Sequence, residues 1–283
     1  QKALQNSHYV SNYWTNLPDK VSSKSYHSNW LHIIVPDHNF DYGKRGEEAI
    51  NLLNENKNLQ THTTIYSFFN FFIFVSTFYD WLLLLFRSYD SIEALKKNSK
   101  QYLWPYLEKD WLESIYGKTA ISNLLTLNLL YESMKSIKKQ KLCVYLMENQ
   151  PWEYALNYSL KTFDHGKVLA FPHTTIKYWD LRYTVGEKIF IHDSNPTYPG
   201  PDLICSSGKI MRRSLISNGY PEKKLIDLEA LRYLFLKDNE IIPYESKIDD
   251  KPLEILVLGH YVYQINIDML DVLEKASVFT ESK

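Results

Sequence analysis

Residues 142–171 decide the fold, and they read LCVYLMENQPWEYALNYSLKTFDHGKVLAF. The first six residues form an apolar run that predicts a buried strand. Residues 151–163 have the composition of a helix and carry Pro151 in the first turn, where proline is favoured. Residues 167–171 form a second short apolar run. A strand, a helix and a second strand in this order predict a parallel β-α-β unit.

The same alternation extends in both directions from this unit. Downstream, we expect strands at 188–191 and 202–205 and a helix at 209–218, which Gly219 closes as the glycine after a helix end. Upstream, we expect a buried strand, a short helix and two long helical stretches, at 30–35, 47–53, 64–97 and 103–138. The sequence therefore predicts an α/β, Rossmann-like fold with a helical, aromatic-rich insertion.

A polar and acidic stretch at 237–253 has the composition of a linker between domains. After it, residues 254–259 predict a new strand and residues 265–276 predict the helix that follows. Such a pair is the first β-α unit of a second Rossmann-like domain, for which too few residues remain to complete a sheet. We therefore expect a first domain at 1–236, with its helical segment at 64–138, and the start of a truncated second domain at 254–283.

Composition and charge narrow the classes of partner. Hydrophobic residues make up 45% and charged residues 23% of the chain, the balance of a folded globular protein. The formal net charge is −1 and no basic stripe alternates with aromatic residues, so we expect no nucleic-acid partner. Cys143 and Cys205 lie in apolar runs, which predicts small buried side chains in a reducing compartment rather than a disulfide or a zinc site. No signal-peptide pattern is present, and we expect a cytoplasmic protein.

The stretch 68–86 raises the question of a membrane. Its residues are all apolar or aromatic except Asn70, Ser76, Thr77 and Asp80. A membrane-spanning helix needs about 20 apolar residues, and an aspartate near its middle costs about 2.5–3.5 kcal/mol. We therefore expect a helix buried inside the protein. A helix lying at a membrane surface is the first alternative, and a true span is the second.

Polar residues follow the first strand of the β-α-β unit. Glu148, Asn149 and Gln150 come directly after it, and Glu153 falls in the first turn of the helix. Open α/β sheets bind ligands at the carboxyl ends of their strands, where Glu148 could take a proton from an attacking hydroxyl. Asn149 and Gln150 could hydrogen-bond a sugar. The structural alternative is that Glu148 is a surface residue and that Glu153 stabilises the helix N-terminus.

A second polar group follows the next strand. His173 and Thr174 stand at the same predicted edge of the sheet, so the two strands would deliver Glu148 and His173 to one crevice. Further candidate substrate-binding side chains are Trp179, Asp180 and Arg182. The guanidinium could bind a phosphate or a carboxylate through two parallel hydrogen bonds, or it could pair with the neighbouring aspartate.

Several motifs of other chemistries are missing from the sequence. The chain has no Gly-x-Gly-x-x-Gly or Walker A loop, no Gly-x-Ser-x-Gly elbow and no histidine spacing typical of a metal site. It also lacks an Asp-x-Asp pair that would hold a metal-bound nucleotide sugar. We expect any chemistry to be metal-independent and to need no cofactor.

Four blocks carry a resemblance to a known family: Glu148-Asn149-Gln150-Pro151-Trp152-Glu153, Gly166-Lys167, Pro172-His173-Thr174 and Trp179-Asp180-Leu181-Arg182-Tyr183. Four later blocks continue it: Pro201-Asp202, Asn218-Gly219-Tyr220-Pro221, Glu229-Ala230-Leu231-Arg232-Tyr233 and Ile255-Leu256-Val257-Leu258-Gly259. Together they resemble a family of bacterial surface-carbohydrate biosynthesis proteins. The likeness spans residues 148–259 and is faint before Lys141.

The resemblance implies a GT-B-like fold, in which two Rossmann-type domains face each other across a cleft, and a glycosyltransferase of capsule or O-antigen synthesis. The first domain would bind the acceptor, a polysaccharide or lipid-linked intermediate, and the second would bind the nucleotide-sugar donor. Glu148 would be the catalytic base, with His173 and Arg182 supporting the acceptor or the leaving phosphate. The residues implied for donor binding are Gly259, His260 and Tyr261.

The family would place the protein in the cytoplasm, in contact with the inner surface of the membrane. One alternative is a non-catalytic carbohydrate-binding or assembly protein with a degenerate GT-B fold. Another is a different sugar-nucleotide enzyme, such as an epimerase, but the chain lacks the dinucleotide-binding fingerprint that an epimerase needs.

Overall fold

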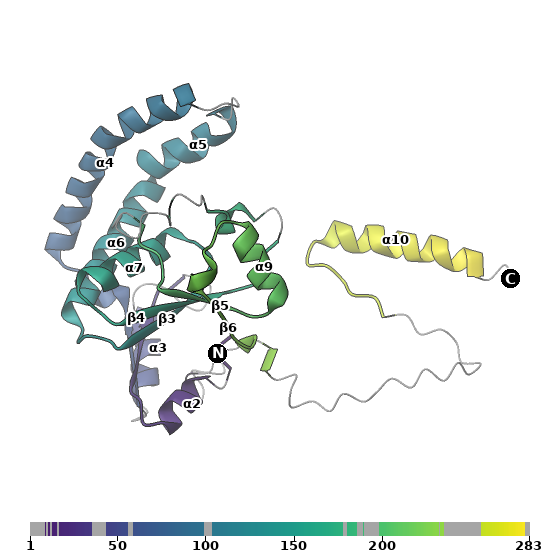
Figure 1. Ribbon diagram of the computed structural model, residues 1–283, viewed down its shortest axis with the longest axis horizontal. Helices are drawn as coiled ribbons and strands as arrows, with labels where there is room; N and C mark the ends of the chain where they lie inside the picture. The colour runs from purple at the N-terminus through teal and green to yellow at the C-terminus, as the bar shows by residue number, and fades with distance from the viewer. Residues whose placement is uncertain are drawn as a thin grey trace. The chain divides into compact units, whose positions relative to one another are not determined.

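The computed structural model describes residues 9, 11, 13–15, 17–35, 44–55, 59–98, 104–177, 180–185, 189, 198–231, 233–234 and 256–280 (Figure 1). The chain divides into two compact units, residues 1–239 and 240–283. The first unit contains every described strand and most of the described helices.

The first unit is built around a four-stranded parallel sheet of order β3-β4-β5-β6. Its strands are β3 Leu142–Met147, β4 Lys167–Pro172, β5 Leu203–Ser206 and β6 Leu225–Asp227. Helix α7, Pro151–Thr162, joins the first two strands, and α9, Lys209–Ser217, joins the last two. This arrangement confirms the predicted α/β fold and is consistent with a Rossmann-like unit. Of the strand predicted at 188–191, Ile189 alone is described, and it is helical.

Side chains of this sheet alternate between two faces. Val168 and Ile204 enter the larger core, which α6 (Lys118–Ser136), α7 and α9 cover. Phe171 enters a smaller core on the other face. Consecutive strands joined by right-handed crossovers place their connecting helices on a single face, so another part of the chain must cover the second. Trp14 of the N-terminal segment packs against that face.

A separate two-stranded parallel sheet precedes the main sheet along the chain. It pairs β1, Ser28–His32, with β2, Gln60–Thr64, and α3, Lys44–Glu55, joins them. The prediction of a buried strand at 30–35 is wrong in part, because β1 begins and ends earlier and Val35 is 78% exposed. A sheet of only two strands leaves much of its surface open, which explains the partial burial of β1.

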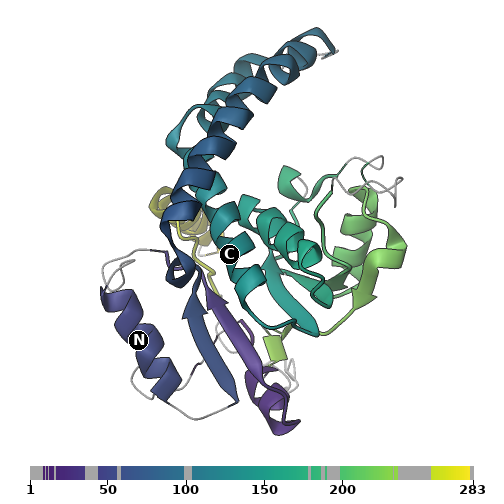
Figure 2. The same ribbon diagram turned by 90° about the vertical axis from the view of Figure 1, so that its left-hand side faces the viewer.

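The predicted helical stretch forms an arm beside the main sheet (Figure 2). Its long elements are α4 Phe71–Asn98, α5 Trp104–Ile115 and α6, and the short helix η1, Ile65–Phe68, precedes them. Helix α6 contacts both α4 and α7, while α4 and α5 extend beyond the sheet. The remaining short elements of the unit are α2 Leu17–Ser23, η2 Leu181–Tyr183 and η3 Glu222–Lys224.

The expectation that the Phe-rich stretch is buried is wrong. Phe72 and Phe86 are both 78% exposed. The buried ones among the described side chains of α4 are Ile73, Thr77 and Ser88. Helix α4 contacts α5 and α6 along a narrow stripe, so its remaining circumference faces outward. By length and composition alone, the part Phe71–Ala94 could cross a membrane.

The second unit is described from residue 256 to residue 280, and it contains helix α10, Tyr263–Thr280. This helix confirms the one predicted at 265–276. The prediction of a strand at 254–259 is wrong for its described residues, 256–259, because they form no strand. A strand needs a neighbour for its backbone hydrogen bonds, and the described part of this unit holds no other strand. The predicted linker at 237–253 lies outside the described residues.

Candidate active site

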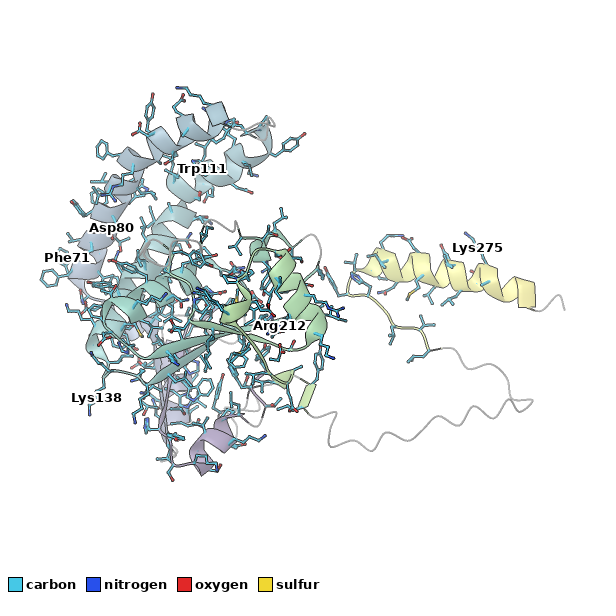
Figure 3. All side chains as sticks on the ribbon, viewed as in Figure 1. Phe71, Asp80, Trp111, Lys138, Arg212 and Lys275 are labelled. Carbon is cyan, nitrogen blue, oxygen red and sulfur yellow. The ribbon has the colours of Figure 1, made fainter. Side chains whose placement is uncertain are left out.

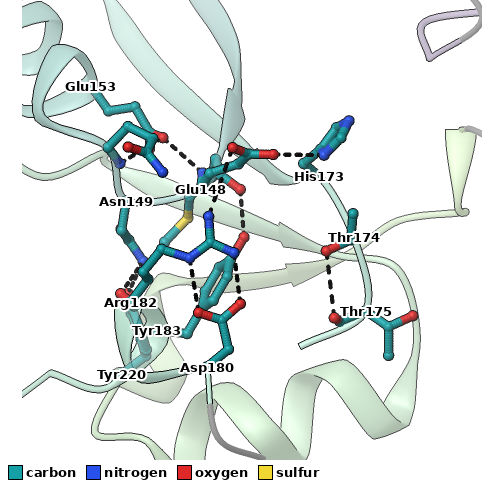
Figure 4. A network of polar contacts seen from close by, with 12 residues as sticks. Glu148, Asn149, Glu153, His173, Thr174, Thr175, Asp180, Arg182, Tyr183 and Tyr220 are labelled. Atoms are coloured by element: carbon teal, nitrogen blue, oxygen red, sulfur yellow. Dashed lines mark hydrogen bonds and ion pairs between the residues drawn. The ribbon is translucent and has the colours of Figure 1, made fainter. Parts of the chain in front are cut away.

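The ends of β3 and β4 bring the two predicted catalytic side chains together (Figure 4). Met147 pairs with Pro172 in the strand register, so the residues that follow them emerge at the same edge of the sheet. Glu148 Oε1 lies 2.7 Å from His173 Nδ1. The two side chains are 37% and 35% exposed, respectively, so both are accessible to a ligand from solvent.

The contact between Glu148 and His173 is short but is not aligned as a hydrogen bond. The carboxylate oxygen lies off the direction of the ring N–H, and His173 Nδ1 has no hydrogen-bond partner among the described residues. A carboxylate oxygen only accepts, so an approach this close is favourable only when Nδ1 carries a proton.

Tyr13 orients the imidazole ring of His173. The two rings are stacked, with their centroids 5.4 Å apart and their planes inclined by 26°. The Tyr13 hydroxyl donates to Pro172 O at 2.9 Å. The sequence analysis missed Tyr13 because it lies 159 positions before Pro172, in a polar N-terminal segment. The available signal was the pair Tyr13-Trp14, two large aromatic residues in otherwise polar surroundings.

Arg182 places a positive charge beside Glu148. Its Nε and Nη2 atoms donate to the two oxygens of Asp180 at 2.9 and 2.8 Å, and its Nη1 atom lies 3.8 Å from Glu148 Oε2. The bidentate pair raises the pKa of Arg182 and lowers the pKa of Asp180. Of the two roles predicted for Arg182, pairing with Asp180 is the one observed, and Nη1 remains directed toward the candidate base.

Two contacts anchor the segment that carries Arg182. The Tyr183 hydroxyl donates to the last carbonyl of β3 at 2.6 Å. Asn149 Nδ2 donates to Arg182 O at 2.7 Å and to the Tyr220 hydroxyl at 3.0 Å. The φ of Asn149 is 56°, a left-handed conformation that asparagine adopts more readily than most residues. The amide donors of Asn149 are thus used inside the protein, where they shape the site, rather than for binding a sugar.

Glu153 is buried beneath the site and cannot contact a substrate. Its side chain is 2% exposed in the first turn of α7, whose N-cap residue is Gln150. Its Oε1 atom accepts from the backbone N–H of Glu148 at 2.7 Å and of Gln150 at 3.0 Å. Burial raises the pKa of this carboxyl, and the backbone donors offset part of the rise. The predicted substrate-binding role is therefore corrected: Glu153 holds the loop that presents Glu148.

Thr174 lies beside His173 in a shallow hollow of about 50 Å³. Ser207, just before α9, and Met211, in its first turn, also line the hollow. Small-molecule sites usually enclose about 300–1,000 Å³, so this hollow supplies only part of a binding site. Trp179 lies outside the described residues.

The predicted donor-binding residues belong to the second unit, where they form an exposed turn before α10. They are Gly259, His260 and Tyr261. Asn266 holds the turn, because its side chain accepts from the backbone N–H of His260 and donates to the backbone carbonyl of the same residue. Tyr261 is 93% exposed. The observed contacts of this turn are those of a helix cap.

No family model, curated protein or solved structure matches this chain. Among the described residues, no three His, Cys, Asp or Glu side chains are grouped to hold a metal ion. A carboxylate, an imidazole and a guanidinium meet at the carboxyl edge of a parallel sheet, and this set can take a proton from a hydroxyl and attract an anion.

Proposed function

We propose that this chain is the acceptor-binding part of a GT-B-type glycosyltransferase, which moves a sugar from a nucleotide donor to a hydroxyl of a surface-polysaccharide intermediate. The proposal rests on the position of Glu148, which lies 2.7 Å from His173 and 3.8 Å from Arg182 at the sheet edge. The resemblance of the strand-end blocks to bacterial surface-carbohydrate proteins supplies the reaction class.

In this proposal Glu148 is the general base. As the acceptor oxygen bonds to the anomeric carbon, the bond from that carbon to the nucleotide phosphate breaks, and the hydroxyl proton passes to the carboxylate. His173 orients the carboxylate through Nδ1, and Arg182 offers Nη1 to negative charge that develops nearby. Because Glu148 is 37% exposed, it can return the proton to solvent after each turnover.

The proposal also names partners and a location. The donor is a nucleotide sugar whose phosphates meet the second domain around Gly259, His260 and Tyr261. The acceptor is a polysaccharide or a lipid-linked intermediate, handled in the cytoplasm at the inner membrane surface. The hollow beside His173 encloses about 50 Å³, which holds only part of such an acceptor.

The substitution Glu148→Gln tests the proposal in the full-length protein, with a donor identified by saturation-transfer NMR. Glutamine keeps the shape of the side chain but cannot accept the proton, so turnover should fall by at least about 100-fold. Acceptor affinity should change little, because the base acts mainly in the transition state. The matched control is Glu222→Gln, which removes a 71%-exposed carboxylate of the same unit and should leave turnover unchanged. Unchanged turnover in Glu148→Gln would contradict the proposal.

A second candidate function is carbohydrate binding without catalysis. The observation that favours it is the occupation of Arg182, whose Nε and Nη2 atoms are already taken by Asp180. In that case Glu148→Gln would weaken sugar binding in the NMR experiment, and no donor would give turnover with the unsubstituted protein.

A further inference from the structure

Helices α4 and α6 form an open groove that shares no residue with the candidate active site. Its wall on α4 consists of Asp80, Leu83, Leu84 and Arg87. Its wall on α6 consists of Leu124, Leu127, Asn128 and Tyr131, with Tyr158 of α7 beside them. Each wall follows the spacing of three and four residues that places side chains on one helix face. The groove encloses about 420 Å³, and ligand sites usually enclose about 300–1,000 Å³.

The middle of the groove is apolar and only partly covered. Its four leucines are neither fully buried nor fully exposed. Protein interiors are close-packed, and contact between leucine side chains and water is unfavourable. A leucine-lined groove that the protein leaves unfilled therefore favours a hydrocarbon chain as its occupant.

The two ends of the α4 wall differ in charge. Asn128 Nδ2 donates to Asp80 Oδ2 at 2.9 Å and holds the carboxylate in place. Arg87 follows two turns later, about 10 Å along the helix axis, and it is exposed. Within the described ranges, no carboxylate lies at ion-pair distance from Arg87. A guanidinium binds a phosphate or a carboxylate well, whereas Asp80 repels an anion. The charges therefore favour a ligand with an anionic headgroup and place that headgroup at the Arg87 end of the groove.

The outer face of α4 indicates where such a ligand comes from. Its exposed large apolar and aromatic side chains from residue 71 to residue 89 are Phe71, Phe72, Phe74, Val75, Phe78, Tyr79, Phe86 and Tyr89. The charged residues of the same stretch, Asp80 and Arg87, line the groove instead. Figure 3 shows Phe71 projecting outward from the helix. An exposed aromatic and apolar face on a helix whose charged residues lie on another face is typical of a helix lying on a lipid surface.

We propose that the groove between α4 and α6 binds a single anionic amphiphile taken from a lipid surface, with its phosphate or carboxylate on Arg87 and its chain along the leucines. The inference goes beyond the proposed transferase activity and does not depend on it. Joined to that activity, it names the acceptor class as lipid-linked.

Titration calorimetry on the full chain tests the ligand class, with n-decyl phosphate below its micelle concentration as the probe. We expect n-decyl phosphate to bind, and inorganic phosphate and neutral n-decyl glucoside to bind at least about tenfold more weakly, because each lacks one of the two contacts. Equal binding of inorganic phosphate would show a simple anion site. Equal binding of the glucoside would show a groove without a headgroup contact. Either result, or no binding at all, overturns the proposal.

Substitutions locate the binding. Arg87→Gln should weaken n-decyl phosphate binding by about tenfold, the contribution of one charge-assisted contact. Leu127→Phe fills the groove with an apolar ring and should weaken binding without loss of melting temperature. The matched control is Lys109→Gln, which removes an exposed charge of α5 and should bind like the unsubstituted chain. Binding that is unchanged in both groove variants overturns the proposal.

Vesicle flotation separates a lipid source from a free one. Vesicles with phosphatidate should carry the chain upward, and Arg87→Gln and Phe72→Ser should both reduce this effect. Binding of soluble n-decyl phosphate should survive Phe72→Ser, which alters only the outer face. If the chain floats with vesicles but does not bind the soluble probe, the aromatic face makes the interaction, and the proposal of a binding groove is overturned. Glu148→Gln should bind normally in both experiments, so a failure of the transferase proposal is distinguishable from a failure of this one.

Discussion

Glu153 shows how a single buried carboxylate supports a site that it does not enter. It accepts from the backbone N–H of both Glu148 and Gln150, and each buried donor left without a partner costs about 1–3 kcal/mol. We expect Glu153→Ala to lower the free energy of unfolding by about 2–4 kcal/mol in urea denaturation. The control Glu222→Ala removes an exposed carboxylate and should change it by less than about 0.5 kcal/mol. Equal effects of the two substitutions would contradict the buried role.

The same carboxyl predicts a pH dependence. Burial raises its pKa above the ordinary value of 4.5, so the folded chain holds this proton more tightly than the unfolded chain does. Its contribution to stability is therefore largest below pH 4.5 and is lost as the pH rises through the raised value. Glu153→Gln has no proton to lose, so its stability deficit should shrink over that window in denaturation curves at several pH values. A deficit that grows with pH would show the opposite sign of the shift.

Some residue contacts could be predicted from the sequence and others could not. Parallel strands emerge at one edge, so spacing alone indicated that Glu148 and His173 would meet. The stacking of Tyr13 on His173 and the bond from Asn149 to Tyr220 join segments that are distant in the chain. Side-chain direction at Asn149 also depends on its positive φ, which no hydrophobic pattern encodes.

At the scale of elements, α4 explains why one sequence-based expectation failed. Burial of the Phe-rich stretch was expected because Asp80 makes a membrane span costly. That cost argues against a span, but it does not indicate which stripe of the helix contacts the rest of the protein. That choice depends on α5 and α6, which pack along one side of α4.

This placement predicts that two neighbouring substitutions differ strongly in their effect on stability. Ile73 is 4% exposed in the larger core, whereas Phe72 is 78% exposed. Ile73→Ala should lower the free energy of unfolding by about 2–4 kcal/mol, because it removes buried methyl groups and leaves a cavity. Phe72→Ala should change it by less than about 0.5 kcal/mol. Circular dichroism during urea denaturation measures both, and a larger loss for Phe72→Ala would contradict the exposed placement.

At the scale of the whole first unit, the strands of the main sheet lie in chain order, so their connecting helices cover only one face of the sheet. The N-terminal segment has to cover the other face. Trp14 is 6% exposed and packs edge-to-face on Phe171, on the sheet face that α7 and α9 leave open. We expect Trp14→Ala to lower the free energy of unfolding by about 3–5 kcal/mol, as large aromatic truncations in cores do. The control Tyr26→Ala, at a 64%-exposed ring nearby in sequence, should have little effect. Similar denaturation midpoints for the two variants would show that the covering is dispensable.

Chain-wide alternation of strands and helices was sufficient to predict the parallel sheet, because each β-α-β unit is local in sequence. The separate sheet of β1 and β2 and the covering by Trp14 depend on contacts between distant segments, so no local pattern contained them. The strand predicted at 254–259 failed for a related reason: an apolar run becomes a strand only beside a partner.

The contacts of the N-terminal segment also affect folding during synthesis. Thr15 Oγ1 donates to Leu231 O across 216 positions, so the two ends of the first unit meet only after nearly all of it has been made. At about 5–20 residues per second, roughly 10–40 s separate the emergence of these two positions from the ribosome. Until β3 and β4 have been made, the indole of Trp14 has no sheet to cover and is available to nascent-chain chaperones. Slower translation ahead of the codon for Phe171 would prolong this exposure and should increase the share of newly made chains that a chaperone captures.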